Sequence, residues 1–232
     1  MGTVVVSVGI DIGQSRDPTA LVITEAERVL LTPGQGWRVP KSQGIVKSEH
    51  IRYDPGVYET VYTVRDLGRL PLGTSYPKVA EHIQNVVAAL AERGIWQPLL
   101  YVDATGVGMP VVDLLSEGLR RTNARLCACT FTHGDKLTLG SNGHTASVGK
   151  AFLVSRLQAM LQSQRLKMPK NTESEALARE LMDYEIKVDN NANDTYGAFK
   201  VGTHDDLVTA LGLSILVDAI KERDRRIVHS FE

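Results

Sequence analysis

The sequence predicts an α/β protein built on one mixed β-sheet that is flanked by helices. A Val-rich apolar run near the N-terminus is followed, after a short turn, by a second run of strand-forming residues. Two such runs across a short connection predict an antiparallel pair. The middle of the chain then alternates between helical and strand patterns, which requires parallel neighbouring strands and right-handed crossovers. We therefore expect a sheet that begins antiparallel and continues parallel.

The first third of the chain is predicted to be mostly strands. Residues 3–11 are Val-rich and continuous, as in a strand buried on both faces, and residues 13–18 have the composition of a turn. Residues 19–24 and 60–70 are expected to form the next two strands. Between them, residues 31–58 contain three prolines and four glycines. We interpret this stretch as an elaborated hairpin or surface insertion, either a tolerated loop excursion or a segment that contacts substrate.

The middle of the chain is predicted to alternate between helix and strand. Apolar residues at helical spacing predict a helix over residues 77–93, which Thr74 or Ser75 would cap and Gly94 would end. The elements expected after it are a strand at 98–103, a helix at 108–121 and a strand at 125–132.

The last third is predicted to mix loop, helix and hairpin. Residues 133–145 are polar and contain glycine, so we expect a mobile loop, and a helix is expected over 147–164. Residues 181–188 and 195–201 suit two strands of a hairpin whose tip is the Asn-rich stretch 190–194. A final helix is expected over residues 204–225.

Composition limits the possible functions. With 232 residues, of which 43% are hydrophobic, the chain suits a single domain over residues 1–232. The formal charge of −1 gives no net attraction to nucleic acid or anionic membrane, so any DNA contact needs a local basic face. Cys127 and Cys129 share one strand face but lie too far apart for an easy disulfide, which fits a reducing compartment. We find neither a signal peptide nor an apolar run long enough to span a bilayer.

Three separated motifs each supply an acidic residue at the end of an apolar element. Asp11 and Asp103 end predicted strands, while Asp205 and Asp206 begin the final helix. In a mixed sheet of this kind the first and fourth strands are neighbours, so Asp11 and Asp103 would face each other, and the final helix would bring Asp205 or Asp206 to the same point. Buried carboxylates need a partner, and divalent metal would satisfy all of them at once.

Each acid also has a simpler explanation. Asp11 could cap the turn before Gly13, and Asp103 could cap the helix that follows it. An acid in the first turn of a helix is stabilised by the helix dipole, and His204 beside the pair could merely neighbour a helix cap. The coincidence of several acids at core-facing ends favours a shared metal site. The chain has no Walker A motif and no zinc-type spacing of His and Cys.

A site made of three or four carboxylates suits two-metal phosphodiester hydrolysis. Two hard cations, Mg²⁺ or Mn²⁺, held roughly 3.5–4 Å apart would activate the attacking water and stabilise the leaving 3′ oxygen. No nucleophilic side chain is then required.

Four motifs in chain order resemble the nuclease domain of the large terminase subunits of tailed bacteriophages. The last two together are the most specific, because sugar kinases share the opening Gly-Ile-Asp-Ile-Gly. The motifs span almost the whole chain and are residues 9–13 with 17–20, residues 72–77, residues 102–108, and residues 204–208 with 210–211.

This resemblance implies an RNase H-like fold and metal-dependent cleavage of double-stranded DNA. It implies metal ligation by Asp11, Asp103 and the Asp205/Asp206 pair; Asp206 is the first choice within the pair because it shares a helix face with Ala210 and Leu213. It also implies a β-hairpin before the final helix, at about 181–201. In the family, partners are an N-terminal ATPase domain, a portal and a small terminase subunit, in the cytoplasm of the infected host. This chain has no ATPase part, so we expect an isolated domain or fragment.

Basic residues flank the predicted site in sequence. Lys150, which opens a helix beside the polar loop, is the best candidate for contact with DNA phosphate; the others are Lys136, Arg156, Lys187 and Lys200. The alternative for each is an ordinary solvated surface side chain. Because the net charge is near zero, we expect the chain to bind DNA weakly.

Two other functions remain open. An actin-like sugar kinase or ATPase shares the core fold and the opening motif, but it needs a second nucleotide-binding half for which 232 residues are too few. A catalytically inactive DNA-binding module would have no reason to keep all the acids.

Overall fold

The Val-rich N-terminal run forms β1 (Val4–Asp11), the strand around which an eight-stranded sheet is built. In this computed structural model the described residues are 4–13, 17–32, 36–38, 51–53, 57–106, 109–183, 185–188, 194–197 and 205–220. The order across the sheet is β10 (Leu166–Lys167), β5 (Val57–Arg69), β2 (Ala20–Thr32), β1, β6 (Leu99–Asp103), β7 (Arg125–Thr132), β9 (Thr145–Gly149) and β8 (Leu137–Leu139).

The pairing confirms the predicted mixed sheet. β1 runs antiparallel to β2, which runs antiparallel to β5. On its other side β1 runs parallel to β6, and β6, β7 and β9 continue in parallel. The first and fourth predicted strands, β1 and β6, are therefore neighbours.

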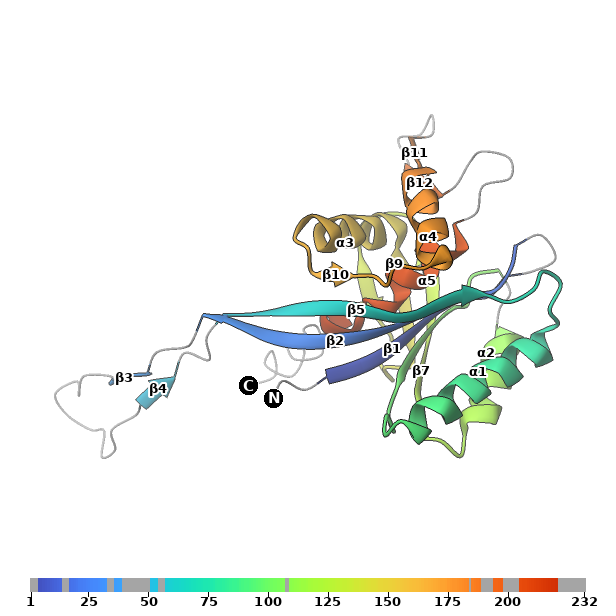
Figure 1. The fold of residues 1–232 in the computed structure, drawn as a ribbon, viewed down its shortest axis with the longest axis horizontal. Coiled ribbons are helices and arrows are strands. Elements are labelled where there is room, and N and C mark those ends of the chain that lie inside the picture. The colour runs from blue at the N-terminus through green and yellow to red at the C-terminus, as the bar shows by residue number, and fades with distance from the viewer. Residues whose placement is uncertain are drawn as a thin grey trace.

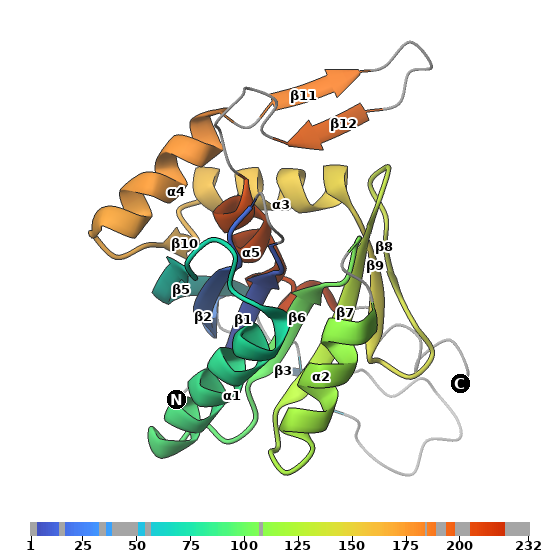
Figure 2. The ribbon, with the colours of Figure 1, turned by 90° about the vertical axis from the view of Figure 1, so that its right-hand side faces the viewer.

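Helices cover both faces of the sheet (Figure 2). α1 (Tyr76–Glu92) and α2 (Met109–Leu119) pack on one face against Val8 and Ile10 of β1. α3 (Lys150–Gln162), α4 (Thr172–Asp183) and α5 (Asp206–Ser214) lie on the other side, where Ser7 Oγ donates to the carbonyl of Ser214 at 2.6 Å. Since side chains alternate along a strand, odd-numbered residues of β1 face α5.

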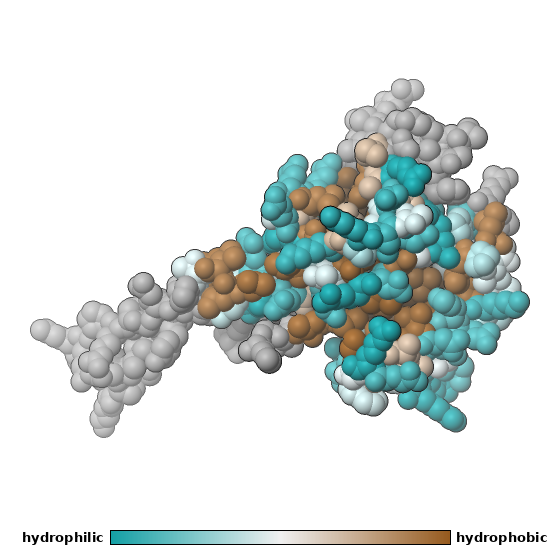
Figure 3. All heavy atoms as spheres, in the orientation of Figure 1, coloured by the Kyte–Doolittle hydropathy of each residue, from teal (hydrophilic) through white to brown (hydrophobic). Residues whose placement is uncertain are grey.

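A long two-stranded ribbon extends from the body of the sheet (Figure 1). β2 and β5 are each 13 residues long, and they lead to the short antiparallel pair of β3 (Gly36–Arg38) and β4 (Ile51–Tyr53). Figure 3 shows apolar atoms gathered on this ribbon, where Leu30, Leu31, Val57 and Tyr58 are exposed. The predicted insertion at 31–58 thus contains a strand pair; its other residues, apart from the ends of β2 and β5, lie outside the described part.

The predicted loop at 133–145 is only partly wrong. The stretch is mostly turn and irregular, but Leu137–Leu139 form β8 and Thr145 begins β9, which pairs with β7 as a further parallel strand. The helix predicted from residue 147 consequently begins at Lys150, and Val148 is a buried strand residue. Such short strands carry little periodicity of their own, and their hydrogen-bonding partners come from elsewhere: β9 pairs with β7 and β8, and β8 pairs with β9.

A helix that was not expected from the sequence pattern precedes the hairpin. α4 covers residues 172–183, so Leu181 is helical and the predicted strand begins only with β11 (Glu185–Val188). β11 pairs antiparallel with β12 (Asp194–Gly197), which confirms the hairpin; its tip, residues 189–193, lies outside the described residues. Signals for α4 exist in the sequence: Asn171 Oδ1 accepts from the Ser174 N–H at 2.9 Å, and acids occupy the first turn.

Two further predictions concern the final helix and the cysteines. The predicted final helix is interrupted: α5 ends at Ser214, residues 217–220 are helical again, and residues 221–225 lie outside the described part. Cys127 and Cys129 are both buried free thiols, as expected. Within the described ranges, none of the helices has the length and apolar character that crossing a membrane requires.

Candidate metal centre

Asp11 and Asp103 lie side by side at the carboxyl ends of two parallel strands. The register pairs Ile10 with Val102, so each aspartate is the next residue on its strand. Ile10 and Val102 face the core under α1 and α2. Because side chains alternate, both carboxylates point to the opposite face, where α5 packs.

Gly9 brings α5 close to this edge of the sheet. A Cβ atom at Gly9 would lie 1.9 Å from the carbonyl oxygen of Ala210 and 2.6 Å from the backbone nitrogen of Ser214. Only glycine permits that approach. The Gly-Ile-Asp sequence therefore has two effects. Gly9 lets α5, which begins at Asp205 and Asp206, pack closely on β1, and two residues later the same strand supplies Asp11.

The four predicted acids influence one another electrostatically. Burial raises the pKa of Asp11 well above its usual range, and Asp103, Asp205 and Asp206 raise it further, in that order. Burial is also the main cause of the raised pKa of Asp103, to which Asp205 adds. Lys150 lowers the pKa of both Asp11 and Asp103. The fold thus brings together all four acids and one of the predicted basic residues.

Asp103 also takes part in a local turn. One of its carboxylate oxygens accepts from the Thr105 N–H at 2.7 Å, and Thr105 Oγ1 accepts from the Phe131 N–H at 2.7 Å. α2 begins only at Met109, so Asp103 caps a turn rather than that helix. These bonds hold the loop after β6 against β7 and orient the Asp103 carboxylate.

Asp206 is buried in a charge network that the sequence does not predict. Its carboxylate accepts from Arg69 Nε at 2.5 Å, and the same guanidinium pairs with Glu180. Arg69 ends β5, and Glu180 lies in α4. Arg69 and Asp206 are 137 residues apart in sequence, so no local spacing could have linked them.

Glu180 also contacts the backbone of α5. Its Oε2 accepts from the N–H groups of Leu207 at 3.1 Å and Val208 at 3.3 Å. Asp205 occupies the N-cap position, but its side chain makes no capping hydrogen bond. A carboxylate from α4 therefore satisfies the helix donors that an N-cap side chain usually satisfies.

The donor set suits a hard divalent cation. Asp11, Asp103 and the Asp205/Asp206 pair offer only carboxylate oxygens, which Mg²⁺ and Mn²⁺ prefer, and burial makes their mutual repulsion costly. In the described part of the chain, no three Asp, Glu, His or Cys side chains form a preassembled metal-binding cluster.

Of the predicted basic residues, the structure describes the side chains of Lys150, Arg156 and Lys136. Lys150 opens α3, and its Nζ lies 5.8 Å from the centre of the Phe131 ring. Arg156 donates to the carbonyl of Ile215 at 2.9 Å and pairs with Asp218, so it holds the fold together. Lys136 is exposed. The side chain of Lys187, and all of Lys200 and His204, lie outside the described residues.

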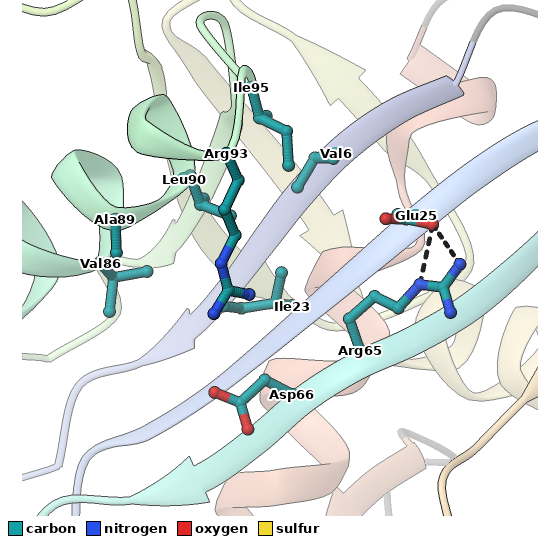
Figure 4. A pocket seen from close by; sticks show the side chains of 10 residues that line it. All are labelled: Val6, Ile23, Glu25, Arg65, Asp66, Val86, Ala89, Leu90, Arg93 and Ile95. Carbon is teal, nitrogen blue, oxygen red and sulfur yellow. Dashed lines mark hydrogen bonds and ion pairs between the residues drawn. The ribbon is translucent and has the colours of Figure 1, made fainter.

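A separate cavity lies between α1 and the sheet (Figure 4). It measures about 640 Å³, has an apolar floor that includes Val6, Ile23 and Leu90, and is bordered by the Arg65–Glu25 ion pair at 2.6 Å. None of the four acids lines it. The cavity is therefore not part of the acidic centre.

No protein-family model matches the sequence, and no curated protein matches it either. Solved structures do match the fold. The large terminase nuclease of thermophilic phage G20c gives a TM-score of 0.54 at 16% identity, over 91% of this chain and 81% of that one. The human cytomegalovirus terminase nuclease domain gives 0.51 at 11% identity, over 93% and 83%.

A third match is the large terminase nuclease domain of Thermus phage P74-26, with a TM-score of 0.51 at 14% identity, over 91% of this chain and 78% of that one. The G20c nuclease has also been solved with bound magnesium and with bound cobalt, and the cytomegalovirus domain after soaking in manganese. At these identities the likeness concerns the fold. It confirms the predicted RNase H-like architecture and the resemblance to terminase nuclease domains at that level.

Proposed function

We propose that this chain is a metal-dependent endonuclease that hydrolyses double-stranded DNA with little sequence preference, as the nuclease part of a viral DNA-packaging terminase. One observation carries the proposal: four acids from β1, β6 and α5 influence one another at one edge of the sheet, in a fold similar to terminase nucleases. Magnesium bound to the G20c nuclease supports the same conclusion. The chain would act as one nuclease domain over residues 1–232.

Asp11, Asp103 and the Asp205/Asp206 pair would hold the cations, two ions of Mg²⁺ or Mn²⁺. When bound, the cations supply activation of the attacking water and stabilise the charge that develops on the leaving oxygen. The residues themselves position the ligands: the Thr105 N–H orients the Asp103 carboxylate, and burial makes a charged Asp11 depend on a positive partner. No nucleophilic side chain is involved.

Lys150 is the proposed contact for DNA phosphate. It opens α3 and is close enough to Asp11 and Asp103 to lower the pKa of both, so a phosphate beside the acids would meet its positive charge. Lys187 and Lys200, in and after the β11–β12 hairpin, would guide the duplex. Further proposed partners are an ATPase domain, a portal and a small terminase subunit, in the host cytoplasm.

The test is plasmid cleavage in a divalent-metal titration. We expect nicking and then cutting with Mg²⁺ or Mn²⁺, with Mn²⁺ at least as effective because it tolerates looser coordination, and none in excess EDTA. Asp113, which is exposed on α2, offers a matched control: Asp113→Asn should leave cleavage unchanged, whereas Asp103→Asn should abolish it. Cleavage that persists in EDTA would refute the proposal.

A further inference from the structure

Two residues outside the predicted site hold the first turn of α5 from different directions. Arg69 comes from the end of β5, opposite Ala20 of β2, and Glu180 comes from α4. Their side chains are 22% and 8% exposed, and that of Asp206 is 4% exposed. The three charged groups thus form one largely buried cluster at the helix N-terminus.

Glu180 fixes the backbone of this turn. The first N–H groups of a helix need acceptors, and here those of Leu207 and Val208 donate to Glu180 Oε2. Because an acidic residue of α4 caps α5, the N-cap residue Asp205 is not needed for that bond. The first turn of α5, which carries Asp206 next to Asp205, is therefore tied to α4.

Arg69 fixes the charge balance of the turn. Glu180 and Asp206 are two buried carboxylates that share one guanidinium. Without the guanidinium, two negative charges would remain close together with little solvent, and the two carboxylates would have to move apart or take up protons.

We propose that Arg69 and Glu180 are positioning residues of the metal centre, which lock the first turn of α5 so that the Asp205–Asp206 carboxylates meet Asp11 and Asp103. This inference rests on the proposed function. Asp206 then belongs to both groups of charges: its carboxylate accepts from Arg69 Nε at 2.5 Å, and it lies in the helix turn that borders the acidic centre.

Mn²⁺ affinity tests the proposal, because a pure charge effect of Arg69 and a positioning effect predict opposite changes in affinity when Arg69 is replaced. Removing the positive charge of Arg69 beside an acidic site should strengthen cation binding if Arg69 acts only through its charge. If it positions the turn, Arg69→Gln should weaken Mn²⁺ binding by about 10- to 100-fold, the usual effect of losing a residue that orients metal ligands. Binding is measured by electron paramagnetic resonance of free Mn²⁺, on the 232-residue chain shown to be folded by circular dichroism.

Three variants complete the design. Arg69→Lys keeps the charge and should restore part of the affinity, and it decides the question if Arg69→Gln does not fold. Glu180→Gln keeps an acceptor oxygen but loses the ion pair, and should also weaken binding. Arg65→Gln removes an exposed ion pair from the same strand, with side chains 57% and 28% exposed, and should change nothing.

Hydrogen exchange gives a second readout that needs no metal. The amides of Leu207 and Val208 should exchange faster in Arg69→Gln and Glu180→Gln than in the wild type or Arg65→Gln. Unchanged or tighter Mn²⁺ binding by folded Arg69→Gln would overturn the inference alone. A wild-type chain that binds no Mn²⁺ would instead refute the proposed function, and with it the role of these residues at a metal centre.

Discussion

Replacing Gly9 with alanine should disable the acidic centre without touching any acid. The new Cβ would lie 1.9 Å from the Ala210 carbonyl oxygen, and both nearest neighbours are backbone atoms of α5, so no side chain can rotate away. To reach ordinary contact near 3.4 Å, α5 has to retreat by about 1.5 Å. That movement would carry Asp205 and Asp206 away from Asp11.

The cost can be stated for both stability and activity. Overpacking of this kind destabilises by about 1–3 kcal/mol, which lowers the melting temperature of a domain of this size by roughly 2–12 °C. A misplacement of about 1 Å in a catalytic site costs on the order of 100-fold in rate. We therefore expect Gly9→Ala to remain folded at 25 °C and to cleave plasmid about 100-fold more slowly than the wild type.

The assay pairs differential scanning fluorimetry with Mn²⁺-dependent plasmid cleavage. Gly68→Ala is the matched control, because Gly68 lies in β5 and a Cβ there meets nothing within 4 Å. This variant should keep wild-type activity and melting temperature or melt slightly higher. If Gly9→Ala matched Gly68→Ala in both measurements, the close approach of α5 would not be what places the acids.

Three further predictions concern charge. Asp11→Asn and Asp103→Asn should each abolish cleavage and slightly raise the melting temperature of the metal-free protein, because each removes a buried like charge. Because the pKa of both acids is raised in the folded state, the free energy of unfolding of the metal-free protein should be largest at low pH, where both acids are protonated, and should fall as pH rises through the raised pKa values. Mn²⁺ affinity should rise over the same pH range, because the ligands lose their protons. Thermal melting and Mn²⁺ binding across a pH series measure the two effects. Charge reversal of Lys187 and Lys200 together should weaken cleavage, and the defect should grow with salt as the remaining attraction is screened.

For each of these three predictions, one outcome would contradict the reasoning. Near-normal cleavage by Asp11→Asn or Asp103→Asn would show that the ligands are wrongly assigned. A pH series in which metal-free Asp11→Asn varies as steeply as the wild type would remove Asp11 as the source of the dependence. Cleavage by the Lys187/Lys200 variant that stays at the wild-type level across a salt series would leave the β11–β12 hairpin with a structural role only.

The sheet and its two strand-borne acids could be predicted because their signals are local. A Val-rich run such as β1 is buried on both faces, and the helix–strand alternation that follows permits few topologies. Those two facts place β1 beside β6 and hence Asp11 beside Asp103. Periodicity within ten or fifteen residues suffices for each step.

Short or polar elements could not be predicted in the same way. β8 is the edge strand of the sheet and pairs with β9, which lies between β8 and β7, and the sequence 133–145 alone resembles a loop. α4 is mostly polar in sequence, and its fully buried Leu177 belongs to the same core cluster as Leu207 and Leu211 of α5. For these elements tertiary contacts decided the structure.

The sequence by itself determined which residues carry the carboxylates and at which ends of the elements they stand. Only the tertiary structure decided what each carboxylate touches: Asp103 the Thr105 N–H, Asp206 the Arg69 guanidinium, and Glu180 the N-terminus of α5. The physical reason is range. Backbone propensity and burial patterns act between near neighbours, whereas an ion pair between residues 137 apart forms only when several elements have already packed.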